Sequence, residues 1–265
     1  MRSLFFVAFC TALAMGQKAP AASQITDASQ ITEEWLVSCG NETGYTEHVR
    51  HFKRLFSAMK VRGFLEFGVG FSTKYFIDNC DRVISAEVIT PGSGPGWLKY
   101  CINLYRDCPN WTPIAYLSGK GLDTSWAPNK YMGIESVYRA ASYHPVYLRS
   151  YSSIDPSYLD DLDKFVREQV AANTIDVGFV DAGVCLRGDM VQTLFNKVPI
   201  VVAHDVAPKE VRHLIDIYGY GRVVVPDNYV EIRVPFGMGT AFWVKNEPEY
   251  FGVIQSLQEY CKGSN

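Results

Sequence analysis

Short apolar runs alternate with helical patterns along most of this chain. Apolar residues recur at intervals of three and four from Tyr45 to Met59, which predicts a helix with one core-facing side. Residues 63–69 (GFLEFGV) are typical of a buried strand, and residues 72–80 (STKYFIDNC) of a helix with Ser72 as its N-cap. By the same criteria we expect further strands at 82–89 and 113–118 and a helix at 97–105.

The second half of the chain continues this alternation and then ends differently. The alternating part predicts helices at 157–172, 187–197 and 209–219, the last closed by Gly219, and strands at 175–182 and 199–206. Two final strands, 229–236 and 240–246, are separated by Gly237-Met238-Gly239, which is typical of a hairpin. A last helix follows from Tyr250 to Tyr260.

Strands that alternate with helices form a mostly parallel sheet with helices on both faces. We therefore predict an α/β fold: a doubly wound, mostly parallel seven-stranded sheet with a C-terminal antiparallel hairpin, in a single domain spanning 45–265. The stretch at about 119–156 is irregular and rich in Tyr, Trp, Gly, Pro and Ser. This insertion is either a lid or substrate-specifying loop, or a segment whose aromatic side chains only pack onto the domain.

The start of the chain has a different character. Arg2, an apolar run from Leu4 to Met15 and several small residues after it are the layout of a signal peptide, which we place at 1–22. Residues 23–44 are expected to be a linker or N-terminal arm. We expect export to a secretory or periplasmic location and no stable membrane span; the alternative is a membrane anchor formed by an uncleaved signal.

Composition narrows the range of partners. The 265 residues carry a formal net charge of −3, which argues against a nucleic-acid binder and favours a small-molecule partner. Six cysteines remain outside the predicted signal peptide, and an even number in an exported chain permits disulfides. Cys101 and Cys108 are the easiest pair to imagine. No feature indicates an oligomeric state.

The turn after the first strand has the pattern of a ligand-binding loop. Gly68 and Gly70 let the backbone approach a ligand where a strand ends and a helix begins. Thr73 stands where a dinucleotide-binding loop would have its third glycine, and Glu66 would repel phosphate but suits an ammonium group. Glu87 ends the next strand about 20 residues later, where a carboxylate can accept both hydroxyls of a ribose.

With an acid for an ammonium group and an acid for a ribose, the chain resembles the class I S-adenosylmethionine-dependent methyltransferases. The matching positions are Glu66, Gly68, Gly70 and Glu87, over an element order that covers about 60–245. The resemblance implies S-adenosylmethionine as cofactor, held by these residues. Ser72 and Thr73 would either contact the cofactor or only cap the helix.

Asp181, His204 and Asp205 end two later strands and should face the same edge of the sheet as Gly68. The resemblance implies that these three are catalytic residues near the methyl acceptor. In some family members acids at these strand ends hold a divalent metal such as Mg²⁺, so that Asp181 and Asp205 would be ligands, although Val206 stands where an amide ligand would be. Without a metal, His204 would be a general base or a structural hydrogen-bonding group.

Two side chains after the fourth strand of the core complete the candidates. Arg187 and Asp189 would either grip an acidic acceptor or pair with each other.

The expected function is methyl transfer from S-adenosylmethionine to a small molecule, such as one with a sugar or aromatic hydroxyl. Export conflicts with this expectation, because the cofactor is made and kept in the cytosol. The alternative is an exported, non-catalytic binding or interaction protein with a methyltransferase-like fold. The presence of both Glu66 and Glu87 favours catalysis. A hydrolase that uses Asp181, His204 and Asp205 is a third option, although the chain has no GxSxG elbow.

Overall fold

The computed structural model describes residues 25–43, 46–92, 94–141, 155–183, 185–206, 218–234 and 237–263. The predicted signal peptide and nearly all of the predicted helix at 209–219 lie outside these residues, so both stay predictions.

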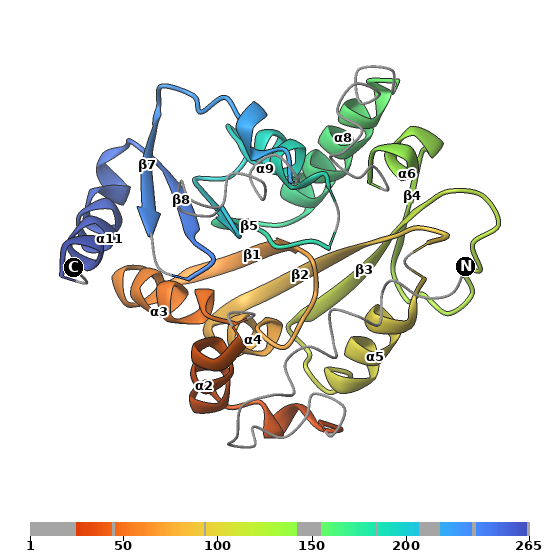
Figure 1. Ribbon diagram of the computed structural model, residues 1–265, viewed down its shortest axis with the longest axis horizontal. Helices are drawn as coiled ribbons and strands as arrows, with labels where there is room; N and C mark the ends of the chain where they lie inside the picture. The colour runs from red at the N-terminus through yellow and green to blue at the C-terminus, as the bar shows by residue number, and fades with distance from the viewer. Residues whose placement is uncertain are drawn as a thin grey trace.

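Helices and strands alternate through most of the described chain, as the sequence predicts (Figure 1). The strands are β1 (Val61–Phe67), β2 (Cys80–Ile89), β3 (Trp111–Ser118), β4 (Lys130–Gly133), β5 (Val177–Val180), β6 (Ile200–His204), β7 (Tyr229–Val234) and β8 (Thr240–Lys245). The helices are α2 (Glu33–Thr43), α3 (His48–Ala58), α4 (Thr73–Asn79), α5 (Gly96–Leu104), α6 (Glu135–Ala141), α8 (Ser157–Ala172), α9 (Arg187–Leu194) and α11 (Phe251–Lys262). Short 3-10 turns lie at Ala28–Gln30, Tyr220–Arg222 and Pro248–Tyr250.

All the strands form one sheet in the order β4-β3-β2-β1-β5-β6-β8-β7. Each neighbouring pair is parallel except those that include β8, which runs antiparallel to β6 and β7. The α/β, doubly wound, mostly parallel architecture with its C-terminal hairpin is confirmed. The chain first winds outward from β1 to β4 and then returns to the other side of β1 at β5, so the winding reverses between β1 and β5.

The sheet of the described chain has eight strands, so the predicted number of seven is wrong. The additional strand, β4, pairs with β3 at one edge, from Ala115 opposite Lys130 to Ser118 opposite Gly133. It lies within the stretch that we expected to be irregular, together with α6. Four residues of alternating exposure make a weak strand pattern, which explains why the sequence did not indicate it.

Helices cover both faces of the sheet (Figure 1). Alternate residues of β1 belong to two separate apolar cores: Phe64 packs with α3, α4 and α5 on one face, and Leu65 packs with α8 and α9 on the other. The first core is rich in aromatic rings around Phe52 of α3, which meets Phe64, Phe76, Phe179 and Phe242 at centroid distances of 4.8 to 6.0 Å. Residues of β1 that alternate with Leu65, including Glu66, therefore face α3 and α4.

The segment predicted to be a loose arm is part of the fold. Ile25, Ile31 and Leu36 are at most 2% exposed and belong to the core on the α3 face. The carbonyl of Ile25 accepts a hydrogen bond of 2.6 Å from the hydroxyl of Tyr100. The arm interpretation of residues 23–44 is therefore wrong from Ile25 onward, because its few apolar residues are spaced to dock on the domain.

Five of the cysteines outside the predicted signal peptide are free thiols: Cys80 and Cys101, which are buried, and Cys108, Cys185 and Cys261. Cys101 and Cys108, the pair that was easiest to imagine from the sequence, are therefore not bonded to each other. Within the described residues, no helix is both long and apolar enough to cross a bilayer.

Leu36→Ala tests the packing of the N-terminal segment. Leu36 is 1% exposed, so the truncation is expected to lower the free energy of unfolding by about 2–4 kcal/mol through lost burial and a residual cavity. Urea unfolding followed by circular dichroism measures the change. Leu159→Ala, on the surface of α8 and 37% exposed, is the matched control and should cost less than about 1 kcal/mol. Equal costs would mean that residues 25–43 do not pack as described.

Candidate functional site

The carboxylate of Glu66 ties the first two strands to the glycine turn. Its Oε1 accepts hydrogen bonds from the hydroxyl of Ser85 on β2, at 2.5 Å, and from the hydroxyl of Thr73 at the start of α4, at 2.7 Å. Thr73 Oγ1 in turn accepts the backbone N–H of Gly70, at 2.9 Å. Glu66 is only 1% exposed, so its role is to hold the turn from beneath. The structure thus places Glu66 and Thr73 in the framework of the turn.

Burial raises the pKa of Glu66 to about 8, against the lowering effect of the hydrogen bonds from Ser85 and Thr73. The nearby carboxylates of Asp181 and Glu87 raise this pKa further. Three acidic side chains therefore lie close enough to repel one another at this edge of the sheet.

The two glycines of the turn have different reasons to lack a side chain. Gly68 has a φ of +97°, and a Cβ on it would lie 2.5 Å from the carbonyl oxygen of Asp181, so close backbone packing requires glycine there. A Cβ on Gly70 would meet nothing nearer than Ser72 Oγ, at 4.0 Å. Gly70 thus leaves open space beside the turn, and Gly68 brings the ends of β1 and β5 together.

Ser72 takes the position before α4, but it does not cap the helix. Its backbone is helical, and its hydroxyl makes no capping hydrogen bond. The predicted capping role of Ser72 is wrong, because its helical backbone (φ −62°, ψ −23°) lacks the extended conformation from which an N-cap side chain reaches the N–H groups of the first turn.

Glu87 is half-buried two residues before the end of β2, beside the glycine turn. Its Oε2 accepts the backbone N–H of Val69, at 3.0 Å, while Oε1 has no hydrogen-bond donor within the described residues. Burial raises the pKa of Glu87 to about 7. One oxygen of Glu87 therefore fixes the turn, and the other is available to a ligand.

A second cluster lies at the ends of β5 and β6, and Arg187 is at its centre. The guanidinium Nη1 lies 2.9 Å from Asp181 Oδ1 and 2.7 Å from Asp205 Oδ2. Nε donates to the carbonyl of Ala182, and the guanidinium stacks over the ring of Tyr218 at 3.9 Å from its centroid. Arg187 is only 5% exposed. The interpretation that Arg187 and Asp189 pair with each other is wrong, because Arg187 pairs with Asp181 and Asp205, whereas Asp189 pairs with Arg222.

A magnesium ion shared by Asp181 and Asp205 does not fit this arrangement. Nη1 of Arg187 already bridges the two carboxylates, so an ion between them would have to displace a buried guanidinium. The positive charge that a metal would bring is supplied by the side chain. Asp205 also has a φ of +58°, a left-handed backbone that is uncommon outside glycine.

His204 is surrounded by carboxylates. Its Nδ1 lies 3.5 Å from Asp181 and 3.4 Å from Asp205, and its Nε2 lies 3.4 Å from Glu47, the residue before α3. Burial alone would lower the pKa of His204, but Asp181, Glu47 and Asp205 together raise it well above its ordinary value. Burial alone would raise the pKa of Asp181, yet Arg187 and His204 lower it. A protonated imidazole has no lone pair with which to take a proton, so His204 in this state is not a general base.

Sequence reasoning missed two residues of this cluster, Glu47 and His48. Both sit at the start of α3 and are at most 6% exposed. The ligand atoms of His48, Asp181 and His204 lie within 4.8 Å of one another. The sequence feature that could have drawn attention to them is a Glu-His pair at the start of a helix whose core-facing side is otherwise apolar. Nothing in the sequence indicates that this end of the helix meets β5 and β6.

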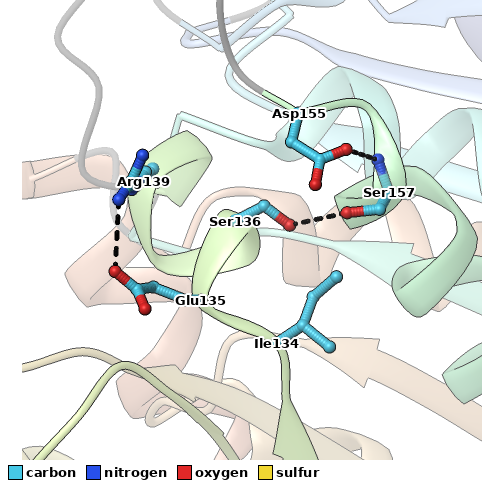
Figure 2. Close-up of a pocket in the computed structure, with 6 residues that line it drawn as sticks. All are labelled: Ile134, Glu135, Ser136, Arg139, Asp155 and Ser157. Atoms are coloured by element: carbon cyan, nitrogen blue, oxygen red, sulfur yellow. Dashed lines mark hydrogen bonds and ion pairs between the residues drawn. The ribbon is translucent and has the colours of Figure 1, made fainter.

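A separate cavity of about 290 Å³ lies between α6 and the start of α8 (Figure 2). Figure 2 shows the hydroxyls of Ser136 and Ser157 facing each other, 3.1 Å apart, with Arg139 turned toward Glu135. Ile134, which directly follows β4, also lines the cavity. Four strand spacings, roughly 19 Å, separate β4 from β5. The cavity is therefore distinct from the cluster at the ends of β5 and β6.

Comparison with known proteins finds similarity only in architecture. Neither the family models nor the curated proteins gave a match. Similar solved structures include a Staphylococcus aureus protein proposed to be a caffeoyl-CoA O-methyltransferase, with 13% identity, 82% of this chain and 94% of that chain covered, and a TM-score of 0.47. The SAH-bound Podospora anserina methyltransferase PaMTH1 has 12% identity, 88% and 100% coverage, and a TM-score of 0.45. The N-methyltransferase NodS from Bradyrhizobium japonicum WM9, in complex with S-adenosyl-L-homocysteine, has 12% identity, 76% and 87% coverage, and a TM-score of 0.38. All three are methyltransferases by name, and likeness at this level carries no inference about activity.

Arg187→Leu tests the ion-pair cluster. The substitution leaves Asp181 and Asp205 without their shared cation, so we expect the free energy of unfolding to fall by about 3 kcal/mol. Urea unfolding at neutral pH measures it. Arg106→Leu is the matched control: its side chain is 73% exposed and should change stability by less than about 0.5 kcal/mol. A neutral result for Arg187→Leu would show that the two carboxylates do not depend on it.

The pKa of Glu66 predicts a dependence of stability on pH. Between its ordinary value of 4.5 and about 8, the folded state holds a proton that the unfolded state has lost, so stability falls as pH rises through this window. One such proton corresponds to a slope of about 1.4 kcal/mol per pH unit. Glu66→Gln cannot titrate, so its unfolding free energy should fall less steeply over this window than that of the wild type. Parallel slopes in the two proteins would contradict the raised pKa.

Proposed function

We propose that this protein is a methyltransferase that uses S-adenosylmethionine and acts on a small-molecule acceptor. The observation that carries the proposal is the carboxylate of Glu87, half-buried beside the glycine turn with one oxygen free of hydrogen-bond donors within the described residues.

The position of this carboxylate supports a nucleoside ligand. In open α/β sheets, ligands bind beyond the carboxyl ends of the strands at the place where the winding reverses. Here that place is between β1 and β5, next to Gly68 and Gly70. Glu87 lies near the carboxyl end of the adjacent strand, β2, where its Oε1 would accept the ribose hydroxyls of a nucleoside that lies against Gly70.

The charge at this edge supports a cationic ligand. Glu87 and Asp181 have side chains in partial contact with solvent, and both raise the pKa of the buried Glu66. A ligand with an ammonium and a sulfonium group relieves this repulsion, whereas a pyrophosphate would add to it. The negative charge of these side chains thus favours S-adenosylmethionine over a dinucleotide as the ligand. Glu66 itself supports the turn from below.

Methyl transfer from S-adenosylmethionine needs little acid-base catalysis by the protein. The acceptor atom attacks the methyl carbon, the bond from carbon to sulfur breaks, and sulfur keeps the electron pair; positioning supplies most of the acceleration. Asp181 and Asp205 would line the acceptor side, and Arg187 would stabilise negative charge on an acceptor oxygen near them. Of the three predicted catalytic residues, Asp205 is the better candidate to take a proton, because the carboxylates around His204 favour its protonated form.

The second candidate function is a binding protein without catalysis. The observation in its favour is that Asp181, His204 and Asp205 are engaged with Arg187 and with one another. Such a protein would bind the nucleoside at Glu87 and transfer nothing from it.

Calorimetric titration with S-adenosylmethionine and S-adenosylhomocysteine tests the binding step. Glu87→Ala removes the proposed ribose acceptor and should weaken binding of both ligands by about 10- to 100-fold, since a hydrogen bond to a charged group contributes about 1.5–3 kcal/mol. Glu87→Gln keeps an acceptor for the Val69 N–H and separates loss of the ribose contact from loss of the turn.

Asp107→Ala is the matched control. This carboxylate is 90% exposed and precedes β3, so it lies at the amino ends of the parallel strands, away from the glycine turn. Its affinity for both ligands should equal that of the wild type. If the wild type gives no heat with either ligand, the proposal fails. If it binds both ligands but releases no S-adenosylhomocysteine on incubation with panels of hydroxyl acceptors, the binding-protein function is favoured.

A further inference from the structure

The imidazole of His48 is buried without a hydrogen bond to any residue that the structure describes. It is 0% exposed, and neither Nδ1 nor Nε2 has a hydrogen-bond partner among those residues. Its ring packs at 5.0 Å from that of Phe179 and 4.6 Å from that of His204, measured between centroids. Buried polar atoms without partners are costly and rare in folded proteins, so each calls for a physical reason.

That reason, we propose, is a divalent transition-metal ion of the zinc type, bound by His48, His204 and Asp181. One ligand atom from each of the three lies within 4.8 Å of the others. Two imidazole nitrogens and one carboxylate oxygen are a ligand set that suits zinc, with a further position for water or substrate. Bonds of about 2.0–2.1 Å place tetrahedral ligands roughly 3.4 Å apart, so ligand atoms up to 4.8 Å apart must draw together by at most about 1.4 Å.

The charge of the cluster matches a divalent cation. The carboxylates of Glu47, Asp181 and Asp205 all lie within 3.5 Å of His204, and Arg187 is the cation that pairs with two of them. Metal binding displaces the proton that His204 holds in the ion-free cluster, and three carboxylates against one guanidinium then leave two negative charges. An ion of charge +2 neutralises them, which a buried site requires.

Arg187 and the metal can use different oxygens of Asp181. The guanidinium lies nearest to Oδ1, at 2.9 Å, which leaves Oδ2 as the oxygen proposed for the ion. The side chain of Asp181 is 22% exposed, so the cluster is open to solvent on this side. The site is thus distinct from a magnesium ion shared by Asp181 and Asp205, which Arg187 excludes.

The ion would join elements that are far apart in the sequence. His48 begins α3, Asp181 follows β5 and His204 ends β6. A bound metal would fix the start of α3 against the strand ends next to the glycine turn. Metal binding is measured directly, so this inference stands or falls independently of the proposed methyl transfer.

Cobalt(II) titration of the chelator-treated full-length protein, under reducing conditions, tests the site. We expect one equivalent of Co²⁺ to bind, with visible absorption typical of a low-coordinate cobalt site and displacement by Zn²⁺. His48→Phe keeps an aromatic ring next to Phe179 but removes the ligand, and should weaken Co²⁺ binding by more than about tenfold and abolish the absorption. His51→Phe is the matched control: His51 is also buried on α3, but its Nδ1 bonds to Thr240 at 3.1 Å, and binding should be unchanged.

Three results would overturn the inference. These are the absence of a cobalt spectrum in the wild type, an unchanged affinity in His48→Phe, and a thiolate-to-cobalt charge-transfer band, which would assign the ion to cysteines. Circular dichroism checks that each variant is folded. If His48→Phe is not, Asp181→Asn replaces one ligand oxygen with an amide and should weaken Co²⁺ binding by a similar factor.

Discussion

The candidate site depends on the hydrogen bonds that Glu66 accepts beneath the glycine turn. A carboxylate enclosed by two strands and a helix would be costly without partners, and the hydroxyls of Ser85 and Thr73 satisfy it. Through Thr73 it also fixes the N–H of Gly70. Because this chain of bonds links β1, β2 and α4, the position of the turn relative to Glu87 follows from the packing of the core.

In the cluster at the ends of β5 and β6, a buried charged group is again satisfied by its neighbours, here by opposite charges and not by hydroxyls. Arg187 is buried, so its position depends on two carboxylates that could not otherwise lie so close together. Those carboxylates come from the ends of different strands, which the parallel sheet brings to one edge. The sheet therefore determines which side chains meet, and the requirement for charge balance determines how they pair.

Periodicity predicted most of the fold, because strands and amphipathic helices impose repeats that a sequence displays. The helix at 157–172 and the hairpin between β7 and β8 appear where expected. The short edge strand β4 and the docked N-terminal segment have too few periodically spaced apolar residues to be predicted from the sequence. In the site, strand-end positions indicated Glu66, Glu87, Asp181 and His204. The roles of Arg187 and His48 depend on contacts between segments that are far apart in the sequence, and no local sequence pattern indicates such contacts.

The left-handed backbone of Asp205 has a consequence for how this edge of the sheet could change. A residue with a side chain pays about 1–2 kcal/mol to adopt that conformation, which glycine adopts freely. Replacement by glycine would therefore relax the main chain while leaving Arg187 with one acid fewer, and the two effects oppose each other. Whether glycine can replace Asp205 thus depends on the guanidinium of Arg187. We expect glycine at this position in related sequences that have also lost the arginine.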